Sequence, residues 1–185
     1  PYAAEKRQSN RLARALAEKF KGKIEASGDS FTARLKLALA ANSIDYGRYG
    51  RLQEEDVLEA METALAAPLD ADAATALRRA VAEADRILYL CDNAGEIVFD
   101  RLLIEVLPRE KITAVVRGMP VINDATYEDA LQAGLHKVAA IASTGCSAPG
   151  AVLSQCSSEF LRSYQEADMV ISKGQGNYEA LVGEE

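Results

Sequence analysis

Two aspartates and an asparagine are the side chains best suited to bind a metal ion. Asp92 and Asn93 are adjacent, and Asp124 follows further along the chain. Carboxylate and amide oxygens are hard donors of the kind that Mg²⁺ and Mn²⁺ prefer, and a set of three ligands leaves coordination positions for water and substrate. The same residue types also cap helices, with Asp92 or Asn93 capping one helix and Asp124 another. On types and spacing alone, both interpretations stay open.

Two glycine-containing segments have the composition of phosphate-binding loops. Lys173 is followed by Gly174 and Gly176, so a positive charge stands beside backbone N–H groups that an anion can approach closely. Thr144 and Gly145 form a second such segment, which could donate hydrogen bonds to the same anion. The alternatives are a solvated lysine in a turn and a tight connection between a strand and a helix.

Several enzyme classes lack the residues that they need. His136 is the only histidine and precedes an expected strand, far from the presumed active edge, so a Ser-His-Asp or Cys-His mechanism has no base. Cys91 is expected to pack as a small apolar group. A GxGxxG sequence is missing after the first expected strand, and GxxxxGK[ST] is missing throughout. NAD binding is therefore disfavoured, and a P-loop nucleotidase is excluded.

The elements that position these residues are predicted from hydrophobic patterning. From Asp85 onward, short apolar, β-branched runs alternate with helix-length stretches, which predicts an α/β fold: a Rossmann-like three-layer domain with a mostly parallel sheet. The candidate residues then follow the carboxyl ends of the strands, where such sheets bind ligands. The expected strands are 86–90, 112–116, 138–141 and 169–171, with helices at 94–107, 126–132 and 150–166.

An alanine-rich segment precedes this pattern. Leu12, Leu16 and Phe20 recur at helical spacing, and further helices are expected at 29–41, 53–66 and 71–84. We therefore divide the chain into a helical region, 1–84, and an α/β domain, 85–185, which together are expected to form one compact unit.

Composition and charge narrow the class of protein. The 185 residues are 49% hydrophobic and 26% charged, which is typical of a folded globular chain. The formal charge of −7 and the lack of a basic run argue against nucleic-acid or anionic-membrane partners. No apolar run approaches the length of a membrane span. Without a CxxC pair or a secretion signal, a reducing, cytoplasmic location is expected, and both ends look cut from a longer chain.

Five sequence blocks together resemble the DUF89 family of metal-dependent damage-control phosphatases, in its prokaryotic branch. They occur in the right order and span most of the chain. The blocks are 42–47 (NSIDYG), 91–100 (CDNAGEIVFD), 117–126 (RGMPVINDAT), 143–150 (STGCSAPG) and 168–179 (DMVISKGQGNYE).

The resemblance implies a metal-dependent phosphomonoester hydrolase that acts on small phosphorylated metabolites, such as sugar phosphates or their damaged relatives. It implies one divalent ion, Mn²⁺, Mg²⁺, Co²⁺ or Ni²⁺, held by Asp92, Asn93 and Asp124. Asp92, Asp124 and Lys173 would carry the catalysis, and either a metal-activated water, which we favour, or Asp92 itself would be the nucleophile. The implied substrate-binding residues are Asn42, Asp45, Ser143, Thr144, Lys173, Gly174 and Asn177.

Two departures and two rival functions remain. Family members carry additional chain before Pro1, with a CxxC element in this branch, and a further strand and helix after Glu185. A Rossmann-like sheet also suits an S-adenosylmethionine-dependent carboxylate methyltransferase, although the Gly-rich first loop is missing. The other rival is a non-catalytic module that binds a metabolite or a metal. The sequence does not determine the oligomeric state.

Overall fold

A parallel four-stranded sheet forms the centre of the protein, in a computed structural model that describes residues 2–43 and 54–184. The strands are β1 (Ile87–Leu90), β2 (Ile112–Val116), β3 (Ala140–Ser143) and β4 (Met169–Ser172), in the order β3-β2-β1-β4. Leu90 is paired with Val115 on one side and with Ser172 on the other. The strands therefore end together at one edge, and the predicted α/β class is confirmed.

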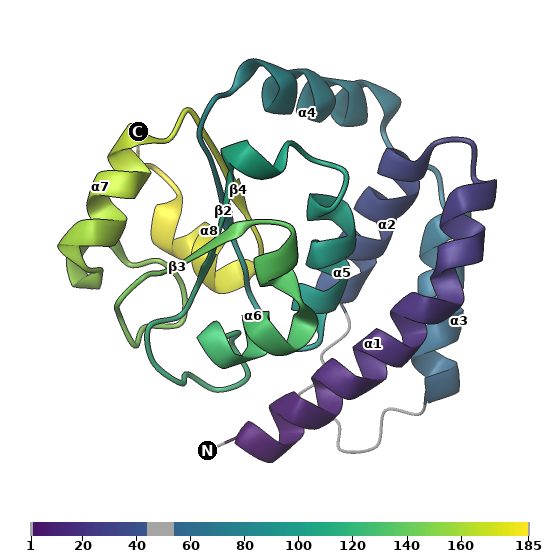
Figure 1. Cartoon of the computed structure of the whole chain (residues 1–185), viewed down its shortest axis with the longest axis horizontal. Coiled ribbons are helices and arrows are strands. Elements are labelled where there is room, and N and C mark those ends of the chain that lie inside the picture. Colours follow the sequence, from purple (N-terminus) through teal and green to yellow (C-terminus); the bar gives the residue numbers. More distant parts are fainter. Residues whose placement is uncertain (1, 44–53, 185) are drawn as a thin grey trace.

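Helices cover both faces of the sheet, so the fold has the three layers that the sequence predicts. Ile87 and Tyr89 of β1 pack into a core with helices α1, α2 and α5, whereas Leu88 and Leu90 pack against Phe160 on the opposite face. Figure 1 shows α5 and α7 on opposite sides of the strands. The helices of the α/β part are α5 (Glu96–Ile104), α6 (Tyr127–Ala133), α7 (Ser158–Glu166) and α8 (Gln175–Leu181).

The N-terminal part is helical, as expected. Its helices are α1 (Ala3–Ala26), α2 (Ser30–Ser43), α3 (Glu54–Ala66) and α4 (Ala71–Glu83). Helix α1 buries one stripe that includes Leu16, Phe20 and Ile24, because these residues recur on a single helical face. Asp70 caps α4 by accepting hydrogen bonds from the backbone N–H groups of Asp72 and Ala73.

Helix α1 is tied to the α/β part by buried polar contacts. The Nδ2 atom of Asn10 donates to Asp129 Oδ1 at 3.0 Å, and Asn10 Oδ1 accepts from the Gly95 backbone N–H at 2.8 Å. Lys6 forms an ion pair of 2.6 Å with Asp129. Because Gly95 lies in the loop after β1, the first helix supports a loop at the edge of the sheet where the strands end.

Several elements differ from the predicted boundaries, and α5, for example, ends at Ile104 and not at residue 107. β3 begins at Ala140, two residues later than expected, because Val138 ends a short 3-10 helix, η2 (Leu135–Lys137). Helix α7 begins at Ser158, because Ser157 caps it by accepting from the Phe160 N–H. The residues before it include a further 3-10 helix, η3 (Leu153–Gln155). Helix α8 was not predicted.

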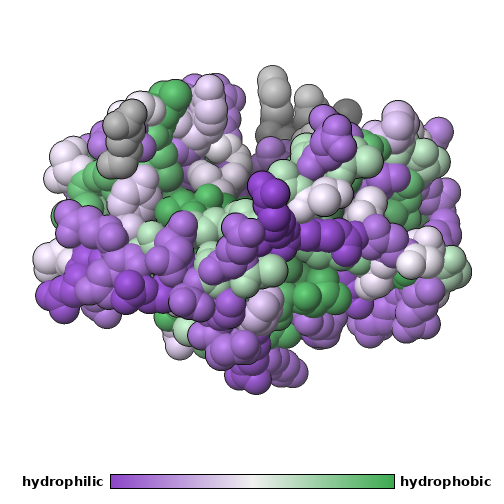
Figure 2. All heavy atoms as spheres, turned by 90° about the horizontal axis from the view of Figure 1, so that it is seen from above, coloured by the Kyte–Doolittle hydropathy of each residue, from purple (hydrophilic) through white to green (hydrophobic). Residues whose placement is uncertain are grey.

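The molecular surface mixes polar and apolar areas. Figure 2 shows one face on which hydrophilic side chains predominate and smaller apolar areas lie among them. In the described ranges, none of the helices combines the length and the apolar character required to cross a bilayer.

Candidate functional site

The candidate site lies at the topological switch point of the sheet, where the chain reverses the direction in which it adds strands. From β1 the chain adds β2 and β3 on one side, and β4 then returns to the other side of β1. Such a switch point leaves a crevice at the carboxyl ends of the strands, where ligands bind in open α/β sheets. Asp92 follows β1, Arg117 follows β2, Ser143 ends β3 and Lys173 follows β4.

The three predicted metal ligands lie together in the loops after β1 and β2. Asn93 Nδ2 donates to Asp92 Oδ2 at 2.7 Å, and the backbones of Asn93 and Asp124 form an antiparallel bridge. The Ala125 N–H donates to the Asp92 carbonyl at 2.7 Å. The described residues contain no group of three or more His, Cys, Asp or Glu side chains that could hold a metal. A metal site here therefore depends on two carboxylates together with the amide oxygen of Asn93.

Arg117 is a member of the site whose role the sequence did not reveal. Its side chain is 1% exposed, and its Nε donates to Asp124 Oδ2 at 2.6 Å. Its Nη2 lies 3.9 Å from Asp92 Oδ1, so one guanidinium faces both predicted acidic ligands. Nη1 and Nη2 are buried and have no hydrogen-bond partner among the described residues, which leaves the N–H groups of both nitrogens available to a ligand or to water. The position after β2 was the only signal in the sequence.

Burial raises the pKa of Asp92 to about 7. The neighbouring carboxylates of Glu96 and Asp124 contribute to this rise, and the charges of Arg117 and Lys173 only partly offset it. The loop after β1 thus holds more negative charge than the surrounding cations compensate. A divalent cation would relieve this repulsion.

Lys173 is held inside the protein by three hydrogen bonds. Its Nζ donates to the Ala38 carbonyl at 3.0 Å, to Glu96 Oε1 at 2.5 Å and to Asp100 Oδ1 at 2.9 Å. Burial acts to lower the pKa of Lys173, but the carboxylates of Asp100 and Glu96 outweigh it and raise the pKa above its usual value. All three N–H donors are in use. A substrate phosphate would have to replace one of these bonds, so direct phosphate contact stays a prediction.

Glu96 and Asp100 are further site residues that sequence analysis did not assign. Both are fully buried on α5, where Ile97, Val98 and Phe99 lie between them. Two acids four positions apart in an otherwise apolar helix are a signal of a buried partner, because unpaired buried carboxylates are very unfavourable. The sequence does not show that Lys173 is that partner.

The loop after β4 packs directly against the predicted metal site. Gly174 has a φ of +86°, and a Cβ at this position would lie 2.0 Å from Asp92 Oδ2. Asn177 is fully buried, and its Nδ2 donates to the carbonyls of Lys173 and Cys91 at 2.7 and 3.2 Å. Its Oδ1 accepts from the Ala151 N–H at 3.0 Å. Asn177 therefore joins three segments around the site. Because its side chain is engaged by these backbone groups, its contact with a substrate stays a prediction.

The other predicted substrate-binding residues lie around the same edge. Asn42, at the end of α2, donates to Glu96 Oε1 at 3.0 Å and to Asp92 Oδ2 at 3.4 Å. Ser143 Oγ accepts from the Gly145 N–H at 3.0 Å, and Thr144 is fully buried.

The β3 loop lies close to Arg117. A Cβ on Gly118 would lie 2.6 Å from the backbone of Gly145, so the loops after β2 and β3 are in contact. Asp45 lies outside the described residues.

The fold and the site together define an α/β protein in which carboxylates outnumber positively charged side chains at the switch point of the sheet. A family model described as the damage-control phosphatase ARMT1-like domain matches residues 1–185. The chain belongs to this family, as its resemblance to DUF89 proteins predicted.

Relatives of known sequence and structure agree with this assignment. The chain is 35% identical over 185 residues to a damage-control phosphatase of Archaeoglobus fulgidus, covering 98% of this chain and 64% of that protein. It is 38% identical over 185 residues to the damage-control phosphatase PH1575 of Pyrococcus horikoshii, covering 98% and 62%. A crystal structure of a DUF89 family protein, PH1575 from Pyrococcus horikoshii, superimposes with a TM-score of 0.88 at 36% identity, over 100% of this chain and 64% of that one. The chain spans less than two thirds of the length of these relatives.

Proposed function

We propose that this chain carries the metal- and phosphate-binding site of a phosphatase that hydrolyses small phosphorylated metabolites. Its substrates would be sugar phosphates or damaged phosphometabolites. Membership of the family, and the names of the archaeal relatives, support phosphatase chemistry. The observation that carries the metal assignment is the convergence of Asp92, Asn93 and Asp124 at the switch point of the sheet.

The donor set fits one hard divalent ion. Asp92, Asn93 and Asp124 would provide oxygen ligands to Mn²⁺, Mg²⁺, Co²⁺ or Ni²⁺. When bound, the ion would neutralise phosphate charge and activate a water molecule for attack. The raised pKa of Asp92 is compatible with this fit, because it reflects burial of the carboxylate beside those of Glu96 and Asp124.

The protein's own residues position and neutralise the reacting groups. Phosphoryl transfer depends mainly on positioning and charge neutralisation, so a histidine base is not required. Arg117 fixes the Asp124 carboxylate and has two buried donor nitrogens for a phosphate oxygen. Lys173 supplies a fixed positive charge behind Asp92, and Asn42 orients the Asp92 carboxylate. Thr144 and Gly174 line the edge to which the phosphate would bind.

Release of inorganic phosphate from a panel of sugar phosphates tests the proposal. The protein is first treated with a chelator, and Mg²⁺, Mn²⁺, Co²⁺ and Ni²⁺ are then added separately. We expect turnover that requires added metal and is lost in Asp124→Asn. Asp72→Asn is the matched control, because Asp72 is an exposed residue of α4 outside the site. This control is expected to retain full activity.

Other outcomes would contradict the proposal in different ways. Turnover that survives chelation, or that persists in Asp124→Asn, would reject the metal assignment. Binding of S-adenosylmethionine without metal, with no phosphate release, would favour a carboxylate methyltransferase. Metabolite binding without turnover, in this chain and in one of the relatives' full length, would favour a non-catalytic module.

A further inference from the structure

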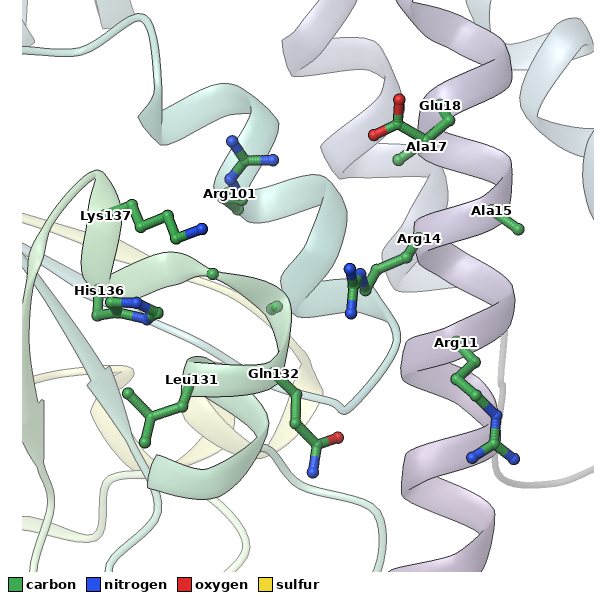
Figure 3. Close-up of a pocket in the computed structure, with 12 residues that line it drawn as sticks. Arg11, Arg14, Ala15, Ala17, Glu18, Arg101, Leu131, Gln132, His136 and Lys137 are labelled. Carbon is green, nitrogen blue, oxygen red and sulfur yellow. The ribbon is translucent and has the colours of Figure 1, made fainter.

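A large basic pocket lies apart from the acidic site. It has a volume of about 780 Å³ and is formed between α1, the last turn of α5, α6 and η2. Arg11 and Arg14 come from α1, Arg101 from α5 and Lys137 from η2. Figure 3 shows Arg14 and Lys137 extending from opposite walls toward the space between them.

The charge of this pocket is opposite to that of the chain. Four basic side chains line it together with one carboxylate, that of Glu18, whereas the chain as a whole carries a formal charge of −7. Glu18 is itself paired with Lys21 at 2.7 Å. In the part of the chain that the structure describes, Arg11, Arg14 and Lys137 have no carboxylate within ion-pair distance. Since the cations come from separate segments, no basic run revealed the pocket in the sequence.

Arg101 adds an unsatisfied donor to the wall of the pocket. Its Nη2 pairs with Glu105 Oε1 at 3.0 Å, but its Nε is buried and has no hydrogen-bond partner in residues 2–43 and 54–184. A buried N–H group without an acceptor is unfavourable. Arg101 therefore contributes the positive charge of its guanidinium group to the wall of the pocket.

We propose that the basic pocket binds a small molecule that carries two or more linked phosphate groups. The pocket volume falls within the roughly 300 to 1,000 Å³ that is typical of small-molecule sites. Arg11 and Arg14 are three positions apart on one helix and share a face, whereas Lys137 and Arg101 lie on the other side of the space. A linked polyphosphate spans both walls, but a single phosphate leaves cations on one wall unpaired.

The single histidine provides a specific test, because His136 lines this pocket. Pyrophosphate, tripolyphosphate and orthophosphate are titrated into the chain in the presence of a chelator and at constant ionic strength, and the NMR signals of the His136 imidazole are followed. We expect a saturable shift, with tripolyphosphate binding most tightly and orthophosphate most weakly. Arg14→Gln and Lys137→Gln should each weaken tripolyphosphate binding about tenfold, since each removes one charge-assisted contact.

Two controls separate this pocket from other sites. Arg79→Gln removes an exposed cation on α4, paired only with Glu83, and should leave the affinity unchanged. Asp124→Asn should also leave it unchanged, because Asp124 belongs to the acidic site.

Three results would overturn the proposal. The first is the absence of a shift at millimolar tripolyphosphate, and the second is equal affinity in Arg14→Gln, Lys137→Gln and the parent chain. The third is loss of the shift in Asp124→Asn, which would assign the effect to the acidic site. Circular dichroism of each variant verifies that it is folded.

Discussion

The ammonium group of Lys173 lies between two buried carboxylates, which makes this residue a test of how the site is held together. Removing it leaves Glu96 and Asp100 without their shared cation. Breaking a buried ion pair by removing one partner destabilises a protein by about 3 to 5 kcal/mol. We therefore expect Lys173→Met to lower the free energy of unfolding by about this amount, as measured by urea denaturation.

Lys21→Met is the control for the Lys173 experiment. Lys21 pairs with Glu18 at 2.7 Å, but both side chains are more than half exposed, at 53% and 66%. Exposed pairs contribute about 0 to 1 kcal/mol. Equal destabilisation by the two substitutions would show that the Lys173 cluster is not a buried, structure-determining network.

For single residues, the sequence indicated which polar side chains could belong to the site, but it did not indicate which residues they contact. Asp92, Asn93 and Asp124 were singled out because polar residues in the loops after apolar strands stand out, and their role as metal ligands stays a prediction. Arg117 and Asp100 could not be assigned, because their roles depend on contacts between segments far apart in the chain. Lys173 was predicted to neutralise the substrate's phosphate; the structure shows its donors engaged by the protein, and the phosphate contact stays a prediction.

Among the structural elements, the loop after β4 allows a test of how closely the backbone must approach the metal site. In Gly174→Ala, the new Cβ would lie 2.0 Å from Asp92 Oδ2, so the loop or the carboxylate must move. We expect Mn²⁺ affinity to fall about tenfold or more, which is the usual effect of disturbing the support of a ligand. Isothermal titration calorimetry measures this change.

Gly183→Ala is the matched control for backbone conformation. Gly183 has a similar φ of +88°, but none of the described residues lies within 4 Å of a Cβ at that position. Both substitutions incur the strain of an alanine at positive φ, whereas only Gly174→Ala crowds Asp92. If both variants bound Mn²⁺ equally well, the close approach of this loop would have no role in the site.

Helix α2 provides a pH-dependent prediction. Asp29 accepts hydrogen bonds from the Thr32 backbone N–H and hydroxyl, and it pairs with Arg78. The bonds from Thr32 and Arg78 lower the pKa of Asp29 to about 2. Since the folded pKa is below the unfolded one, this stabilisation is present above the unfolded value and is lost as the pH falls toward 2.

We therefore expect Asp29→Ala to reduce stability by about 1 kcal/mol at neutral pH, as is typical for loss of an N-cap. The difference from the parent chain should shrink as the pH falls below 3.8, the ordinary pKa of an aspartate. Asp29→Asn, which retains a capping side chain, should be less destabilised at neutral pH. Denaturation series at several pH values measure these differences, and a constant difference between parent and Asp29→Ala down to pH 2 would contradict the argument.

At this scale, patterning predicted the elements but not all of their ends. The strands were found because continuous apolar runs are typical of a parallel sheet covered on both faces. The start of β3 was predicted too early, because Val138 has strand propensity but caps the 3-10 helix η2. Helix α8 was missed because Gly176 and Asn177 are poor helix formers, and their segment was interpreted as a loop.

For the whole molecule, we expect one cooperative unfolding transition. Asn10 of α1 bonds to Asp129 and to the Gly95 N–H, so the helical region and the α/β part share buried polar contacts. Asn10→Leu leaves the Gly95 donor unsatisfied and should cost about 1 to 3 kcal/mol. Far-ultraviolet circular dichroism and tyrosine fluorescence should give the same midpoint. Two separate transitions would show that the helical region unfolds independently.

The most direct test of the central proposal is a Mn²⁺ binding isotherm for the parent chain and for Asp124→Asn, with Asp72→Asn as the control. The account predicts one Mn²⁺ per chain for the parent and for the control. It predicts that Asp124→Asn loses this site, because one of only two carboxylate ligands is removed. Undiminished binding of one Mn²⁺ by Asp124→Asn, or no binding by the parent chain, would contradict the assignment of the metal centre to Asp92, Asn93 and Asp124.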